Sequence, residues 1–361
     1  MKNKLMTTAL VTSMLSIGVT SAVAQTTITG NIDISYFGTS AKGGTAGTTK
    51  SQSSQRGFGK ESQVNFANKG KMSNGMDYAA GFSIELDGPD TGGTGTFAEN
   101  TYIDLISGNT TITLGADHIQ NPDRQIANLV GFGYIGIDGI NNVISSYPKN
   151  INSPYGSFGV GLVQTIPGLG KVSALYVPDR SGATVQNDIF NGNQSANDGG
   201  ESQVEFGFKG DLGVKGLDVG IFYNKGDKQE VGLSTTKDRK GSKIDGSYNF
   251  GQFTIAADYS KMEGVDTGTG TTGAMTAGLD EHKAKSVGVA YAINKAVSIG
   301  YAYGETETSE AGKPDEKNHL VAIGYNLGPV VAQVQYKSAD NHSNVRGLDG
   351  EQIAVKFGTR F

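Results

Sequence analysis

The chain of 361 residues contains no cysteine. This absence excludes a disulfide framework, a thiolate metal site and a cysteine nucleophile. Apolar residues are also scarce, at 36 % against about 45–50 % in ordinary globular domains. A soluble protein of this length would struggle to build its cores from so little apolar material. Disorder is the simple alternative, but the 15 Tyr and 15 Phe argue against it.

Long apolar runs are missing as well. No segment beyond the N-terminal region holds 18 consecutive apolar residues, so the sequence predicts no transmembrane helix. The net charge of −5 argues against nucleic acid as a partner. The four histidines form no His-x-x-x-His pair, and no phosphate-binding or dinucleotide fingerprint follows a strand. We therefore expect no metal, no cofactor and no enzymatic activity. The histidines are His118, His282, His319 and His342.

Glycine, in contrast, is abundant, with 54 residues, roughly double its usual share. A chain so rich in turn residues and so poor in apolar ones fits a transmembrane β-barrel. In such a barrel only the lipid-facing side of the wall is apolar, while the interior is polar.

The first residues resemble an export signal. Lys2 and Lys4 give a positive start, an apolar stretch runs over 5–19, and Ala22-Val23-Ala24 provides a small-x-small cleavage site. A membrane anchor is the alternative, but the stretch is short for a span of about 20 residues. We expect residues 1–24 to be a signal peptide that is removed, and residues 25–361 to form the barrel.

The mature chain has a period of two. Between Thr27 and Phe37, apolar residues share one face of a strand and polar residues share the other. A helix would instead space its apolar residues three and four apart. The same alternation recurs along the chain and predicts sixteen strands. We expect them at 27–37, 61–69, 75–87, 98–106, 110–117, 154–165, 170–178, 200–211, 216–226, 241–250, 252–262, 283–292, 295–306, 316–326, 329–338 and 350–361.

The predicted connections alternate in length. Short ones contain tight-turn residues, such as Ser107-Gly108-Asn109 and Leu327-Gly328. Short turns on one side and long loops on the other are typical of outer-membrane barrels. The sequence thus predicts an all-β, antiparallel, sixteen-stranded transmembrane barrel. The expected long loops are 38–60, 88–97, 118–153, 179–199, 227–240, 263–282, 307–315 and 339–349.

The last strand and a strand pair in the first third of the chain carry a family resemblance. The chain ends on an alternating strand with Phe357 and Phe361, which looks like the C-terminal signal that outer-membrane barrels present to their assembly machinery. The segments 102–108 and 111–115 resemble the strand pair before the third loop of general Gram-negative porins, most closely the neisserial and betaproteobacterial branch. That pattern often continues with Arg, where this chain has Ala116 and Asp117.

The resemblance implies a homotrimer of barrels in outer-membrane lipid, each narrowed by a third loop folded into the lumen. It also implies passive diffusion of ions and small hydrophilic solutes, and insertion by the barrel-assembly machinery. The longest connection, 118–153, contains apolar residues such as Ile126, Leu129 and Phe132, which suggests that it packs against something. An external flap or a contact with a neighbouring subunit is the alternative to an inward fold.

Charged side chains around a constriction set the selectivity of such pores. The third-loop candidates are Asp117, Asp123, Arg124 and Asp138. The candidates on inward faces of the wall are Asp33, Asp77, Glu85, Asp104, Lys209, Lys243, Lys337, Lys356 and Arg360. Each could instead be a solvated lumen residue away from the narrowest point. The early strands carry carboxylates where the family's wall arginines are expected, so we expect a mild cation preference.

Three other functions stay open at this stage. A solute-specific outer-membrane channel would have the same pattern. A barrel enzyme would need a nucleophile beside a base, and no serine is clearly paired with His319. A secreted adhesin could use the Gly/Thr-rich stretches 43–49 and 264–278 as linkers. Asp87 and Asp90 could bind Ca²⁺ in a loop, although the EF-hand spacing is absent.

Overall fold

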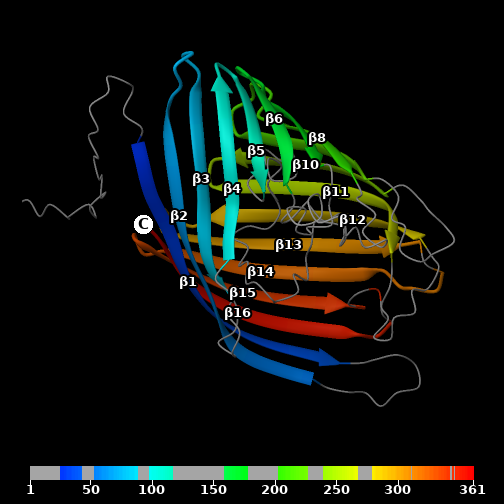
Figure 1. Cartoon of the computed structure of the whole chain (residues 1–361). Coiled ribbons are helices and arrows are strands. Elements are labelled where there is room, and N and C mark those ends of the chain that lie inside the picture. The colour runs from blue at the N-terminus through cyan, green and yellow to red at the C-terminus, as the bar shows by residue number, and fades with distance from the viewer. Residues whose placement is uncertain are drawn as a thin grey trace, which may run out of the picture.

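The computed structural model forms a closed barrel of sixteen antiparallel strands, in which every strand pairs with its neighbours in the chain and β1 pairs with β16 (Figure 1). This confirms the predicted fold class. The residues that the structure describes are 25–42, 53–87, 97–116, 158–177, 202–226, 239–266, 279–309, 311–341, 344 and 346–361. The predicted signal peptide, 1–24, lies outside them.

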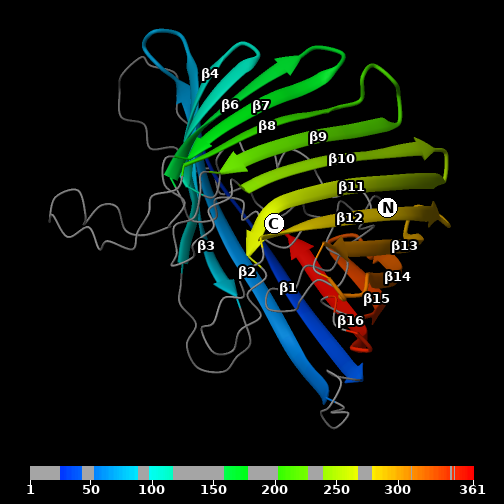
Figure 2. The same ribbon diagram turned by 90° about the vertical axis from the view of Figure 1, so that its right-hand side faces the viewer.

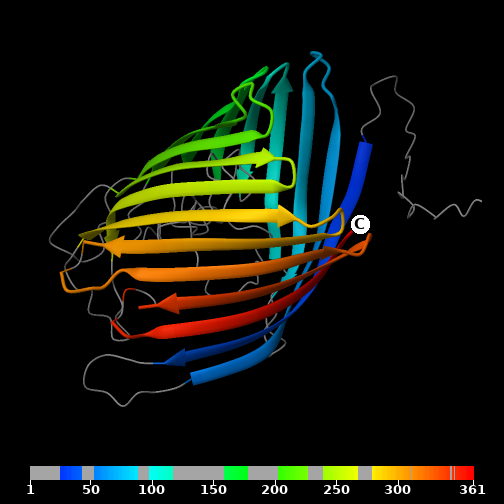
Figure 3. The same cartoon turned by 180° about the vertical axis from the view of Figure 1, so that it is seen from behind.

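Each of the sixteen predicted strands corresponds to an observed one. Figures 2 and 3 show the strands following one another around the wall in chain order. The bounds are β1 Gln25–Lys42, β2 Ser53–Lys71, β3 Asp77–Asp87, β4 Phe97–Ser107, β5 Thr110–Ala116, β6 Phe158–Ile166, β7 Gly170–Val177, β8 Gln203–Gly210, β9 Leu217–Gly226, β10 Arg239–Phe250, β11 Phe253–Asp266, β12 Leu279–Ala292, β13 Val297–Thr308, β14 Glu316–Asn326, β15 Val330–Asp340 and β16 Asp349–Arg360.

Tight turns close one end of the barrel, which we call the turn end. Between β4 and β5, Gly108 adopts a φ of 58°, a left-handed conformation that glycine adopts without steric cost. Between β14 and β15, the Asn326 side chain accepts a hydrogen bond from the Gly328 N–H at 2.8 Å, a local bond that stabilises the turn. The opposite end, which carries the longer connections, is the loop end. Both Gln25 and Phe361 lie at the turn end.

The predicted first loop, 38–60, is wrong over much of its length. Residues 38–42 belong to β1 and residues 53–60 belong to β2, and the pairing continues to Ala41 opposite Ser53. These segments are rich in Gly, Ser, Thr and Lys, so they lack the alternation that marks a lipid-facing wall. With Phe58 as the only large apolar residue on the outward face of 53–60, the alternation is too weak to predict a strand there.

A β-bulge interrupts β4, which the alternation also failed to reveal. Register shifts between Gly81 and Ser83 of β3, so that two residues of β4 oppose one of β3. Asn100 has a φ of 53°, and its side-chain amide donates a 2.7 Å hydrogen bond to Ser83 Oγ. Asparagine tolerates this left-handed conformation better than most residues. The bulge reverses which residues of β4 face inward on its two sides.

No helix in the described part of the chain is long and apolar enough to cross a membrane.

Candidate functional site

The two faces of the wall are inverted relative to a soluble protein. On β1, Asp33 and Ser35 are 2 % and 4 % exposed, whereas Ile34 between them is 53 % exposed. The largest fully buried side chains include Gln203, Glu205, Asn224 and Gln335. Buried polar and exposed apolar residues are both costly in water. The arrangement therefore suits a barrel whose outer face contacts lipid and whose inner face, here called the lumenal wall, is polar.

Aromatic side chains line the outer face near the turn end. The rings of Tyr248, Phe250, Phe253 and Tyr291 form a continuous row across β10, β11 and β12. Their successive centroids are 6.0, 5.7 and 4.7 Å apart. A second group lies towards the loop end, where Tyr301 Oη contacts His319 Nδ1 at 2.8 Å. Aromatic girdles at both interfaces are a property of membrane barrels.

Charged residues of the outer face begin beyond the loop-end aromatics. On β11, Lys261 follows Tyr259 by one outward position and pairs with Glu263 at 2.6 Å and Glu281 at 2.8 Å. From Phe253 to Lys261 the strand rises about 27 Å, at about 3.4 Å per residue. After allowing for strand tilt, this distance is close to the apolar band of about 25 Å expected for such barrels. The outer face thus has the dimensions of a membrane-spanning wall.

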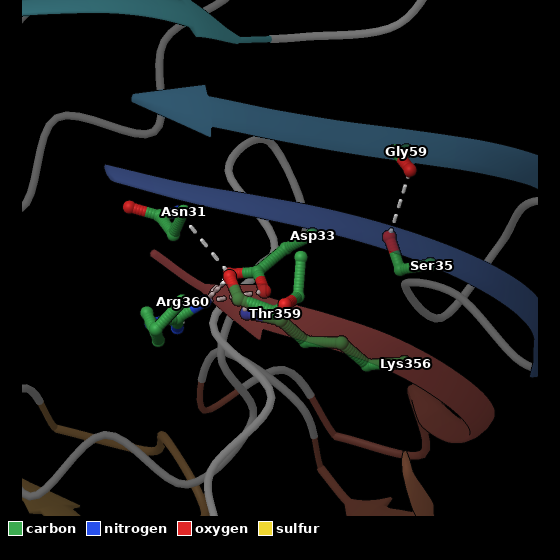
Figure 4. A network of polar contacts seen from close by, with 7 residues as sticks. All are labelled: Asn31, Asp33, Ser35, Gly59, Lys356, Thr359 and Arg360. Carbon is green, nitrogen blue, oxygen red and sulfur yellow. Dashed lines mark hydrogen bonds and ion pairs between the residues drawn. The ribbon is translucent and has the colours of Figure 1, made fainter. Parts of the chain in front are cut away.

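All nine predicted wall charges lie in the inward phase of their strands, which buried members such as Asp33, Lys243 and Lys337 mark. The densest group joins the first and last strands (Figure 4). Asp33 accepts hydrogen bonds from Arg360 Nη1 at 2.8 Å and Nη2 at 3.2 Å, and Lys356 Nζ lies 2.9 Å from its carboxylate. Asn31 Nδ2 donates to the same carboxylate at 3.4 Å. The sequence predicted that Asp33, Lys356 and Arg360 lie on the inner face, but it did not predict that they are in contact.

The neighbouring strand contributes to this group. Ser35 Oγ donates a 3.2 Å hydrogen bond to the carbonyl of Gly59 on β2 (Figure 4). The side chain of Asp33 is 3 % exposed, while that of Arg360 is 64 % exposed. The guanidinium of Arg360 therefore faces the lumen, while the carboxylate of its partner Asp33 stays covered.

A second charged group is buried on β10 and β11. Lys243 Nζ lies 3.1 Å from Asp245, and the two side chains are 2 % and 1 % exposed. Asp245 lies directly opposite Asp258 in the antiparallel register, and Asp258 is also buried. One cation thus lies beside two carboxylates, an arrangement in which loss of the cation would leave like charges facing each other.

The remaining predicted wall residues occupy separate positions. Asp77 pairs with Lys71 at 2.8 Å at the turn end, and Lys209 lies 3.8 Å from Asp218. Thr113 donates a hydrogen bond to the buried Asp104. Glu85 is half-buried on β3, and Lys337 is buried on β15, opposite Leu320 and Gln352. Most charges of the wall therefore lie in pairs of opposite sign.

Sequence reasoning did not include several inner-face charges among the site residues. The alternation of side chains could have identified these charges, because each lies in the inward phase of its strand. They are Lys171, Glu205, Asp218, Asp245, Asp258 and Glu316.

The four third-loop candidates, Asp117, Asp123, Arg124 and Asp138, lie outside the described residues, as do Asp90 and the Asp87 side chain. Within the described ranges, no group of three or more His, Asp or Glu residues could hold a metal ion.

Comparison with known proteins agrees with this geometry. A family model described as Gram-negative porin matches residues 7–355. No curated protein matches the chain. Among solved structures, Salmonella typhi OmpF in complex with daunomycin is 11 % identical with a TM-score of 0.64, over 93 % of this chain and 98 % of OmpF.

Two further solved structures share the fold. A refined porin structure is 15 % identical with a TM-score of 0.59, over 93 % of this chain and all of that one. Vibrio cholerae OmpT, folded in vitro and described as a trimer form, is 14 % identical with a TM-score of 0.55, over 94 % of this chain and 99 % of OmpT. At these identities the structures support the fold alone, whereas the family model covers nearly the whole sequence. The chain belongs to the Gram-negative porin family.

Proposed function

We propose that this porin is a passive diffusion channel of the outer membrane for ions and small hydrophilic solutes. The observation that carries the proposal is the inverted wall: a closed sixteen-stranded barrel with apolar residues outside and buried polar residues inside. Barrels of sixteen strands are wide enough to leave an aqueous channel. Family and fold indicate a channel rather than an enzyme. The exposed apolar outer face also does not fit a soluble secreted adhesin.

Solute uptake into liposomes tests this function. Vesicles containing the refolded protein are diluted into solutions of neutral sugars of increasing size, and their swelling is followed by light scattering. We expect fast swelling with small sugars and a smooth decline with size. Uptake of one sugar that greatly exceeds that of smaller ones would instead show a solute-specific channel. No uptake by folded, inserted protein would contradict the proposal.

The third loop, 118–153, narrows the pore in this proposal, with Asp123, Arg124 and Asp138 within it and Asp117 directly before it as the charged residues of the constriction. Support comes from the sequence, because this long connection contains apolar residues such as Ile126, Leu129 and Phe132 that can pack against the wall. Deletion of 126–137 tests this, because the conductance should then increase.

A weak cation preference fits the charges of the wall. Carboxylates and cations of the described wall are both numerous and mostly paired, as in Lys243–Asp245 and Lys71–Asp77. Paired charges cancel at a distance, so the net field on a permeating ion is small. A reversal potential that shows clear anion preference in a salt gradient would contradict this part of the proposal.

Export, assembly and oligomeric state complete the proposal. Cleavage after Ala24 releases residues 25–361, and the last strand with Phe357 and Phe361 is the segment that the barrel-assembly machinery reads. The mature chain forms a homotrimer, which is consistent with the trimeric form of the similar OmpT structure. Native mass spectrometry of detergent-purified protein tests the trimer, and a monomeric mass would contradict it.

A further inference from the structure

The seam between β1 and β16 lacks a constraint that every other strand pair in the described barrel has. Neighbouring strands elsewhere follow one another in the chain, so their connection helps to set the register. β1 and β16 are joined only by their own contacts. The inward and outward alternation forbids a slip of one residue, because it would turn polar residues to lipid. A slip of two residues keeps apolar side chains towards lipid and polar side chains towards the lumen, so contact with lipid does not disfavour it.

A glycine of β1 receives a side chain of β16 on the outer face. Gly30 and Phe361 exchange backbone hydrogen bonds of 2.9 and 3.0 Å. A Cβ atom on Gly30 would lie 2.5 Å from Cζ of the Phe361 ring and would also overlap the carbonyl oxygen of Gln63. The terminal ring therefore lies over the backbone of the first strand at a position where only glycine leaves room.

The lumenal wall shows the reciprocal arrangement. Gly358 of β16 lies directly opposite Asp33 of β1. A Cβ atom on Gly358 would overlap Asp33 Oδ1, and its nearest contacts involve side chains alone. The Asp33 carboxylate therefore lies across Gly358, with Lys356 and Arg360 on either side (Figure 4). Each strand thus provides one glycine and one side chain that covers the glycine of the other.

A slip of two residues would destroy both contacts. In one direction Asp33 would lie opposite Arg360, and Gly30 would lie beyond the end of β16. In the other direction Asp33 would lie opposite Lys356, and Gly30 would face Thr359 in place of the ring. In either case the carboxylate would lose the space above Gly358 and its position between two cations.

We propose that these two contacts, Phe361 over Gly30 and Asp33 over Gly358, form a register lock that closes the barrel in one register among those that the membrane tolerates. Strand stagger, tilt and diameter of a barrel are linked. The lock therefore also fixes the width of the pore.

Engineered cysteine pairs can measure the register directly, because the natural chain has none. Thr39 lies opposite Gln352 on the lumenal wall, six residues along β1 from Asp33. Since the Gly30–Phe361 pair is hydrogen-bonded, alternation makes 39–352 a non-hydrogen-bonded pair, with Cα atoms about 4.5 Å apart, within the range of a disulfide. Thr39→Cys with Gln352→Cys reports the native register. Thr39→Cys with Ala354→Cys or with Gly350→Cys reports the two slipped registers.

The proteins are refolded from denaturant into lipid vesicles without any assembly factor, oxidised, and scored for the disulfide by mass spectrometry. When Gly30, Asp33, Gly358 and Phe361 are all unchanged, we expect only the native cysteine pair to form a disulfide. Asp33→Ala, or Gly358→Ala, should raise the slipped disulfides relative to the native one at least about tenfold, as expected for the loss of one charge-assisted hydrogen bond.

Two controls keep the test decisive. Gly38→Ala changes another glycine of β1, but its Cβ would have ordinary room, at 3.6 Å from Ile353 Cγ2, so the register should not change. In the double variant Asp33→Ala with Gly358→Ala, no carboxylate lies across position 358. The ratio of slipped to native disulfides should therefore equal that of Asp33→Ala alone.

If Gly358→Ala does not fold, the double variant Asp33→Ala with Gly358→Ala shows whether the carboxylate of Asp33 is the cause. Recovery of folding in the double variant supports the lock, because the carboxylate was then the obstacle. Failure of both variants to fold would overturn the proposal. It would also be overturned if Asp33→Ala and Gly358→Ala retained the native register, or if Gly38→Ala shifted the register equally.

Discussion

The Asp33 carboxylate of the first strand binds the Arg360 guanidinium of the last strand at 2.8 Å, although 327 residues separate them in the sequence. The pair lies on the lumenal wall at the turn end, with Lys356 on the same carboxylate. Two cations of the last strand therefore face this one anion of the first strand.

Replacement of Asp33 by Asn should shift the pore towards anions. Asparagine keeps the shape of the side chain but removes the negative charge that faces Lys356 and Arg360. One unit charge at about 10 Å in water contributes about 0.4 kcal/mol, or about a twofold change in the permeability ratio. The reversal potential in a KCl gradient measures this change. The matched control is Asp340→Asn, which removes the same charge from the outer face and should leave the ratio unchanged.

Loss of Lys243 should strongly destabilise the barrel. Lys243→Met leaves the buried Asp245 and Asp258 without their neighbouring cation. Breaking one partner of a buried ion pair costs about 3–5 kcal/mol. Urea-induced unfolding in lipid vesicles measures this loss of folding free energy. It can be followed by gel mobility or by tyrosine fluorescence, which is not masked because the chain has no tryptophan.

The exposed pair Lys71–Asp77 provides the comparison for that experiment. Both of its side chains are more than half exposed, so Lys71→Met should cost about 0–1 kcal/mol. Equal losses for the two lysine variants would contradict the assignment of Lys243 to a buried ion pair.

A charge placed on the middle of the outer face should be costly. Ala257 is exposed on β11, midway between Phe253 of the turn-end aromatic row and the charged Lys261. Ala257→Arg should cost about 2–4 kcal/mol of folding free energy in vesicles, whereas near the interface the same charge costs about 0–1 kcal/mol. Ser242→Arg, opposite Lys261 in the charged outer region, is the control. If Ala257→Arg leaves the folding free energy unchanged, lipid does not contact this face.

The exported protein should begin at Gln25. Its intact mass, measured after extraction from the outer-membrane fraction, should equal that of residues 25–361. Replacing both Ala22 and Ala24 by Leu removes the small residues that signal peptidases require, and the uncleaved precursor should accumulate. A mature protein that retains residues 1–24 would contradict this boundary.

Alternation of side chains predicted the number of strands and the identity of the lumenal wall. It did so because lipid and water impose opposite demands on successive residues, as Asp33 and Ile34 show on β1. The same physics explains the failures. The loop ends of β1 and β2 carry mostly Gly, Ser, Thr and charged residues, so alternation carries little information there.

Contacts between strands could not be predicted in the same way. The meeting of Asp33 with Lys356 and Arg360, and of Asp245 with Asp258, depends on the register between strands. A period of two fixes which face a residue occupies but not which residue lies opposite. The bulge at Asn100 depends on a local hydrogen bond to Ser83 that no pattern in either strand reveals.

Single-channel recording of the refolded protein in a planar bilayer, in symmetric KCl, tests the central claim most directly. An open, water-filled sixteen-stranded pore should insert in large, stable conductance steps that scale with the KCl concentration, in groups of three if the protein is trimeric. Protein that is folded and inserted, as shown by its resistance to protease and its β-sheet spectrum, yet gives no conductance would contradict the account.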